Sequence, residues 1–132
     1  MNIKPFEKLS KGKAKLYFVN FYKKEDNSYH FSKNGITRFV DAADRFRYEP
    51  DQYRHWTIKV LFSVIGPENL IKKEEDYLKS LYKKDFWLPD DLFFKGITEI
   101  RKYNRSQISE IIMYMKGLKY KLTVNTQQVK KN

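Results

Sequence analysis

Two histidines, His30 and His55, are the first candidates for catalytic chemistry in this sequence. Two histidines and a lysine can act as general base, general acid and charge stabiliser in a ribonuclease that needs no metal ion. His30 falls in a short predicted strand, and His55 falls on the polar side of a predicted helix. Nothing in their spacing indicates that the two rings meet, so the sequence does not favour this chemistry.

A nuclease motif is the second candidate, because Pro89-Asp90 and Glu99-Ile100-Arg101 resemble the PD-(D/E)xK pattern. In that pattern acidic residues hold a metal ion and a lysine assists the attacking water. Here the spacing is short, arginine replaces lysine, and the segment is predicted to be helical. The five glycines are isolated and cysteine is absent, which excludes a phosphate-binding glycine loop and thiolate chemistry. We therefore expect a protein that is not an enzyme and that has no metal ion or cofactor.

Basic residues are mixed with aromatic residues near both ends of the chain. Surfaces that bind single-stranded nucleic acid contact phosphates with lysine or arginine and stack bases on exposed rings. The residues with this pattern are Lys13, Lys15, Tyr17 and Phe21 in the first predicted strand, and Lys119, Tyr120 and Lys121 in the last. The alternative is that the rings are core and the lysines form a solvated rim. Tyr120 alternates with its lysines, which in a strand places it on the opposite face.

The net charge of +11 is concentrated at the two ends of the sequence. Residues 1–24 carry +6 and residues 100–132 carry +7, whereas residues 25–99 carry −2. If the ends lie close together, they form one positive face suited to a polyanion. The abundance of residues with A/T-rich codons can explain part of the lysine excess, but codon bias does not predict its uneven placement.

Two predicted helices joined near Asn104, followed by a basic strand, have the order of a winged-helix DNA-binding unit. The second helix offers a poor set of residues to a DNA groove, so we interpret it as core. That set is Gln107, Ser109, Glu110 and Lys116. Arg101, Lys102 and Arg105 can still contact phosphates.

These observations predict a small basic protein that binds nucleic acid, or another polyanion, with low sequence specificity through its N- and C-terminal segments. The predicted binding residues are Lys11, Lys13, Lys15, Tyr17, Arg101, Lys102, Arg105, Lys116, Lys119 and Lys121. A second hypothesis is a structural or accessory subunit of a virion, a conjugative machine or a ribonucleoprotein, which acts through protein–protein contacts. In that case residues 86–89 (FWLP) are a candidate interface anchor, with a local core plug as the alternative.

The longest stretch rich in apolar residues, residues 52–65, is expected to lie in the core. Its polar residues are three or four positions apart, as on one stripe of a helix, and Gly66-Pro67 follows as a stop signal. A strand remains open, because apolar residues also alternate with more polar ones from Ile58 to Val64. We favour the helix.

The remaining segments predict an α+β fold. Residues 14–23 and 28–32 form an expected β-hairpin, whose first strand is apolar on both faces; one face should pack on helices and the other be partly exposed or covered by a partner. Besides residues 52–65, we expect helices over residues 36–46, 67–85, 90–103 and 106–116. Gly117 is expected to end the last helix, and residues 118–124 to form a strand that joins the hairpin. About five helices would then cover a small antiparallel or mixed sheet.

The length of 132 residues predicts a single domain, with residues 1–13 as a basic arm and residues 126–132 as a frayed basic tail. The lack of cysteine excludes a disulfide-dependent secreted fold. We find no signal peptide and no apolar run of transmembrane length. The expected location is cytoplasmic or virion-associated, without membrane contact, and the sequence indicates no oligomeric state.

Overall fold

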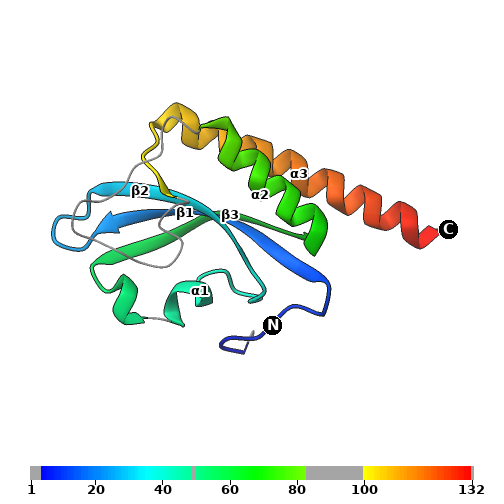
Figure 1. Ribbon diagram of the computed structural model, residues 1–132, viewed down its shortest axis with the longest axis horizontal. Helices are drawn as coiled ribbons and strands as arrows, with labels where there is room; N and C mark the ends of the chain where they lie inside the picture. Colours follow the sequence, from blue (N-terminus) through cyan, green and yellow to red (C-terminus); the bar gives the residue numbers. More distant parts are fainter. Residues whose placement is uncertain (1–3, 49, 83–99, 132) are drawn as a thin grey trace.

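A four-stranded antiparallel sheet forms the centre of the computed structural model, which describes residues 4–48, 50–82 and 100–131 (Figure 1). The strand order is β3-β1-β2-β4. The elements in chain order are β1 (Lys13–Lys23), β2 (Tyr29–Thr37), α1 (Asp44–Arg47), the 3₁₀ turn η1 (Pro50–Tyr53), β3 (Trp56–Pro67), α2 (Glu68–Leu81), β4 (Ile100–Arg101) and α3 (Arg105–Lys131). The α+β class and the N-terminal hairpin are confirmed. Within the described residues there are three α-helices, not about five.

The strand β1 is the central element, because it pairs with β2 on one side and along its whole length with β3 on the other. Successive side chains of a strand point to opposite faces. Ala14, Leu16 and Phe18 accordingly belong to one core cluster, and Tyr17, Val19 and Phe21 to the other. Both faces are therefore buried within the chain itself, which corrects the expectation that one face is partly exposed or covered by a partner.

Residues 56–67 form the strand β3, so the helix predicted over residues 52–65 is wrong. Val60 and Phe62 pair with consecutive residues of β1, which leaves Leu61 as the extra residue of a β-bulge. The bulge reverses the direction of the following side chains: Val60 packs with one core cluster, and Leu61 and Phe62 pack with the other. This change of phase interrupts the alternation of a regular strand and produces a spacing that resembles a helix.

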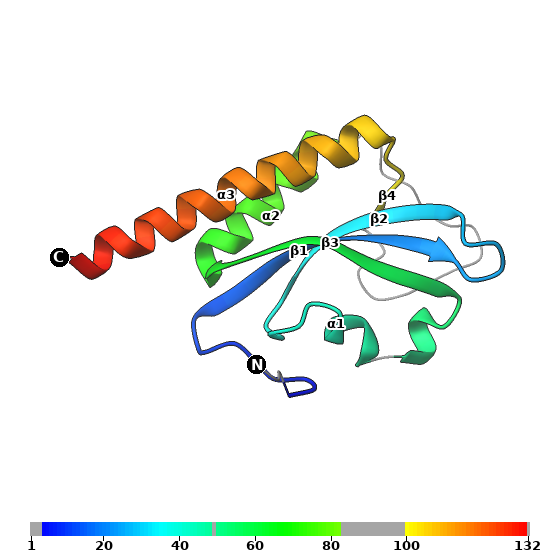
Figure 2. The same cartoon turned by 180° about the vertical axis from the view of Figure 1, so that it is seen from behind.

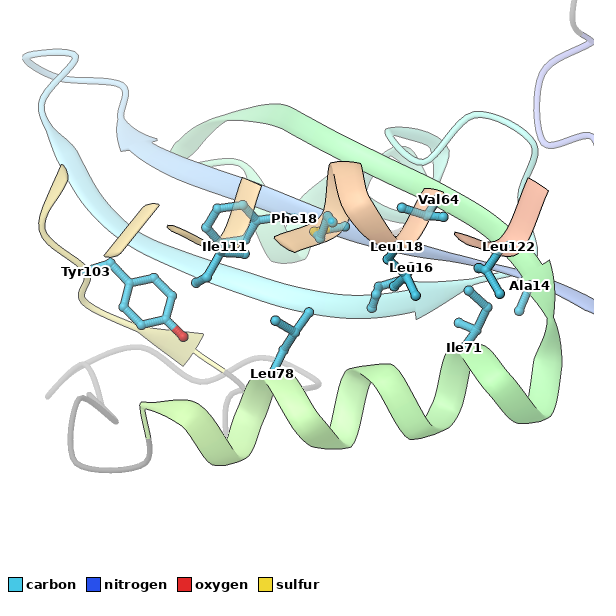
Figure 3. Packing of buried hydrophobic residues seen from close by; sticks show 11 residues of the cluster. Ala14, Leu16, Phe18, Val64, Ile71, Leu78, Tyr103, Ile111, Leu118 and Leu122 are labelled. Carbon is cyan, nitrogen blue, oxygen red and sulfur yellow. The ribbon is translucent and has the colours of Figure 1, made fainter. Parts of the chain in front are cut away.

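The helices α2 and α3 cover one face of the sheet (Figures 1 and 2). Figure 3 shows their inward side chains, among them Ile71, Leu78 and Leu118, packed against Leu16 and Phe18 of β1. The helix predicted from residue 67 is confirmed as α2. Its residue Glu75 is buried and forms ion pairs with Lys72 at 3.1 Å and Lys79 at 3.3 Å, which satisfy the charge.

The helix α3 continues through Gly117, so the predicted helix stop and the predicted strand over residues 118–124 are both wrong. Leu118 and Leu122 fit an alternating pattern, but they also follow Ile111 and Met115 at helical spacing, and all four are buried in the same cluster. Burial of this continuous stripe outweighs the cost of about 1 kcal/mol for one glycine in a helix.

The start of α3 is fixed by a reciprocal capping box. The side chain of Asn104 accepts a hydrogen bond from the backbone N–H of Gln107 at 2.9 Å, and the side chain of Gln107 accepts one from the N–H of Asn104 at 2.9 Å. Asn104 is therefore the cap, two residues before the predicted Ser106.

The other face of the sheet is covered by α1, by η1 and, at one end, by the N-terminal residues (Figure 2). The helix predicted over residues 36–46 is wrong, because β2 runs to Thr37 and α1 covers only Asp44–Arg47. The N-terminal segment is bound to the loop after β2: Lys8 bridges Phe39. Most of the helix predicted over residues 90–103, and the FWLP segment, lie outside the described residues; residues 100–101 form β4 instead of a helix.

Candidate functional site

The residues predicted to bind nucleic acid do not form one surface. Lys11, Lys102, Arg105, Lys116, Lys119 and Lys121 are exposed, Lys13 and Lys15 are partly buried, and Tyr17 and Arg101 are buried. The structure therefore divides them into an internal group, a group at the end of the sheet where β1 begins, and a group at the opposite end.

Tyr17 belongs to the internal group and cannot stack on a base. Its side chain is fully buried, and its ring contacts the ring of Phe46 edge-on at 5.5 Å between centroids. Its hydroxyl oxygen accepts a hydrogen bond from Nζ of the buried Lys33 at 3.1 Å. Phe21 is also fully buried. The rings of β1 are core, as the alternative interpretation of the sequence had it.

Arg101 and Lys15 place their charges against backbone carbonyls. The guanidinium of Arg101 donates to the carbonyl of Ile100 at 2.9 Å and to that of Lys79 at 3.4 Å. Nζ of Lys15 donates to the carbonyl of Val40. Burial lowers the pKa of Lys15, although the nearby carboxylate of Asp41 opposes this shift. Both cations are thus engaged with the backbone of the chain itself.

The part of α3 that follows Glu110 is basic. It has no acidic residue, and its lysines Lys116, Lys119 and Lys121 are all exposed. Tyr120 lies among these lysines with its side chain 74% exposed, because in a helix it points away from the buried stripe. The strand prediction had placed this ring opposite its lysines.

The strand β1 begins, with Lys13, at the end of the sheet that the later part of α3 reaches (Figures 1 and 2), and Lys11 is two residues before it in the sequence. Lys13 pairs with Pro67 in the register between β1 and β3. The preceding Gly66 is so close to α3 that a Cβ atom there would lie 2.9 Å from Cδ1 of Leu122. The two basic ends of the sequence thus lie at the same end of the molecule, through a helix and not through the predicted strand. Alternation along β1 places Lys13 with Lys15 and Tyr17, on the face of the sheet opposite to α3.

Arg105 and Lys102 lie at the opposite end of the molecule, where α3 begins. Lys121 is sixteen positions after Arg105 along the helix, which corresponds to about 24 Å. Arg105 and Lys102 therefore belong with the end of the sheet that carries the β1–β2 turn.

At that opposite end, the two histidines line one cavity of about 420 Å³. Its lining residues are Lys23 at the end of β1, Lys24 and Glu25 in the turn that follows, His30 in β2, Arg54 and His55 just before β3, and Trp56 at the start of β3. The backbone N–H of Lys24 donates to the carbonyl of His55 at 3.2 Å, which joins the turn to the start of β3.

His30 is held in a defined orientation within this cavity. Nε1–H of Trp56 donates to Nδ1 of His30 at 3.0 Å, so the neutral imidazole carries its proton on Nε2. Burial lowers the pKa of His30, and the positive charges of Lys23 and Lys102 lower it further. Arg54 Nε lies 3.4 Å from Nε2 of the exposed His55.

A signal for this cavity is present in the sequence, but it was missed together with the strand β3. Once residues 56–67 pair antiparallel with β1, Trp56 lies opposite Lys23, and His55 lies directly beyond that pair. His30 follows Tyr29, which pairs with Tyr22 on the other side of β1. Pairing of β1 with both neighbours therefore predicts that the two histidines lie at the same end of the sheet, on either side of β1.

Among the described residues, no three or more of the His, Asp and Glu side chains gather in a group that could hold a metal ion. No helix in the part of the chain that the structure describes has both the length and the apolar character needed to cross a bilayer. No family model, curated protein or solved structure matches the chain.

Proposed function

We propose that this protein binds nucleic acid with low sequence specificity through residues 116–121 of α3 and the start of β1. The observation that carries the proposal is Tyr120, which is 74% exposed among Lys116, Lys119 and Lys121. Lys13, the first residue of β1, and the nearby Lys11 add positive charge at the same end of the sheet.

The residue types at this surface suit contact with a backbone and not with base edges. Lysine is a flexible point charge that neutralises phosphates, whereas arginine is preferred for bidentate recognition of guanine. Lys116, Lys119 and Lys121 lie ten or more residues before the end of α3 at Lys131, outside the last turn in which the helix dipole favours a cation, so the dipole does not account for them. The exposed ring of Tyr120 suits stacking on an unpaired base.

The first experiment measures binding to single- and double-stranded oligonucleotides as a function of salt. Contacts from several lysines to phosphates predict a steep, linear fall of log affinity with log salt concentration. The double variant Lys116→Glu, Lys121→Glu should bind much more weakly and with a shallower slope. The matched control is Lys59→Glu, Lys73→Glu, which reverses two exposed charges on β3 and α2. Equal loss in both variants would refute a site on α3.

The second experiment isolates the ring of Tyr120. Stacking of one base contributes about 1–3 kcal/mol, so Tyr120→Ala should weaken binding of a single strand by about 5- to 150-fold. Binding of a duplex, whose bases are already stacked, should change little. The same loss for both ligands would show that the ring does not stack on bases.

A structural or accessory subunit is the second candidate function, and the exposed apolar part of α3 favours it. Met113 is 72% exposed and lies seven residues before Tyr120, on the same side of the helix. If nucleic acid does not bind even at low salt, this candidate replaces the first. Self-association that Met113→Lys abolishes, measured by sedimentation, would then support it.

A further inference from the structure

The cavity with the two histidines lies at the opposite end of the sheet from the lysines of α3, so what it binds is a separate question. Three of its lining residues, Lys23, Lys24 and Arg54, are permanent cations at neutral pH, and Glu25 is the one carboxylate among them. Lys102 adds positive charge nearby, since it lowers the pKa of His30. The cavity is therefore positive on balance and suited to an anion.

The two lysines of the turn have no ion-pair partner among the residues that the structure describes. The positive charge of Lys23 helps to lower the pKa of Asp26, but Oδ1 of Asp26 accepts hydrogen bonds from the backbone N–H of Ser28 at 3.0 Å and from its hydroxyl at 2.7 Å. The carboxylate of Asp26 is thus engaged within its own turn. Lys23 and Lys24 can therefore turn their ammonium groups toward a bound anion at little cost.

The walls of the cavity are fixed before any ligand binds. The hydrogen bond from Trp56 to His30 joins β3 to β2, and the backbone bond from Lys24 to His55 joins the turn to β3. Trp56 is only 5% exposed, so this frame is anchored in the core. Preorganised walls lower the cost of ordering on binding.

A second cavity, of about 250 Å³, adjoins the first and shares Lys24, Arg54 and Trp56 with it. Its other lining includes the rings of Phe46 and Tyr53 and the side chain of Ile58, together with the cation of Arg47. A ligand with an anionic group and a flat apolar group fits this pair, because the anion meets the cations and the flat group meets the rings.

We infer that the first cavity binds a phosphate monoester, with the group that carries the phosphate directed to the adjoining aromatic cavity. Lysine, arginine and imidazole N–H groups that approach from three segments match the several oxygens of a tetrahedral phosphate. Both a free nucleotide and the phosphorylated end of a nucleic acid supply this chemistry. The inference does not depend on the function proposed for α3.

Binding is tested on the full chain by NMR, through the indole N–H signal of Trp56, assigned with the variant Trp56→Phe. The probes are inorganic phosphate, AMP, adenosine, and one oligonucleotide with and without a 5′-phosphate. Phosphate and AMP should shift the signal at millimolar concentration, and adenosine should not. A shift with the 5′-phosphorylated oligonucleotide that its 5′-hydroxyl form lacks identifies the nucleic-acid end as a source of the phosphate. A shift with AMP but with neither oligonucleotide identifies the free nucleotide.

Variants then localise the site. Lys23→Gln and Arg54→Gln should each weaken AMP binding by about tenfold, as expected for loss of a charged hydrogen bond. Lys73→Gln, on the exposed side of α2, should leave it unchanged. The double variant Lys116→Glu, Lys121→Glu should also leave it unchanged, which separates this site from the one proposed on α3. No shift with any phosphate, equal binding of adenosine and AMP, or equal weakening by Lys73→Gln would each overturn the inference.

Discussion

The hydroxyl oxygen of Tyr17 lies 2.3 Å from the point that a Cβ atom on Gly35 would occupy. The two residues are partners in the antiparallel register of β1 and β2, and the tyrosine ring lies over the bare backbone of the glycine. Nζ of Lys33, two residues before Gly35, then reaches the tyrosine hydroxyl. The missing side chain at position 35 is therefore a packing requirement of this face of the sheet.

The variant Gly35→Ala should unfold more easily than the natural chain. The added methyl group meets the ring of the buried Tyr17, and overpacking of this kind costs about 1–3 kcal/mol. Urea unfolding followed by circular dichroism measures the change in the free energy of unfolding. An unchanged midpoint would show that Tyr17 does not lie over Gly35.

The variant Gly117→Ala should have the opposite effect. A Cβ atom at this position meets nothing within 4 Å, and the residue lies inside α3. Alanine in place of glycine in a helix interior contributes about 0.5–1 kcal/mol. A loss of stability would contradict a continuous helix through Gly117 and would revive the helix stop that the sequence predicts.

Ser32→Ala should destabilise the junction between β1 and β2. The hydroxyl of Ser32 donates to the side-chain oxygen of the buried Asn20 at 2.6 Å and bonds the hydroxyl of Tyr29 at 2.7 Å. Loss of a buried partner costs about 1–3 kcal/mol. Ser109→Ala, at an exposed position of α3, is the control and should change stability little. A similar result for both variants would show that the buried network contributes nothing.

The stability of the protein should fall as the pH is lowered through the range in which histidine titrates. The pKa of His30 lies below its ordinary value, because the ring is partly buried and Lys23 and Lys102 are near it. The unfolded chain therefore takes up the proton first, at about pH 6.5. The free energy of unfolding decreases below that pH, and this decrease ends below the pKa of the folded state.

Urea midpoints between about pH 8 and pH 5 measure this dependence. His30→Gln keeps an acceptor for Trp56 Nε1–H but removes the titration, so its midpoint should vary less with pH. His55→Gln is the comparison, and Glu25 and Arg54, which line the same cavity, remain in both variants. If His30→Gln retains the full dependence, another group is responsible.

The sequence predicted those elements whose local pattern agrees with their tertiary contacts. The hairpin and α2 are examples, since each has one periodicity and clear turn or end signals. Residues 56–67 were mispredicted because the bulge at Leu61 changes the phase of the side chains, and pairing with β1 is a long-range effect that a local pattern does not contain. Leu118 and Leu122 fit both a strand and a helix, and burial against β1 and α2 decides between them.

The same distinction applies to the candidate sites. The exposed lysines near both ends could be predicted from charge alone, but the burial of Tyr17 and Arg101 could not, because it depends on which face of the sheet α1 and α2 cover. The cavity with His30 and His55 required the registers on both sides of β1. Its residues come from three segments that are separated in the sequence and that only the sheet brings together.

The strand β1 begins at Lys13 and ends at Lys23, and these residues belong to the two proposed binding regions. Ten steps of a strand measure about 33 Å, and pairing on both sides keeps this distance rigid. β1 thus fixes the distance between the regions. An oligonucleotide shorter than this distance can occupy either region but not bridge them, so the number of oligonucleotides bound per protein chain depends on their length.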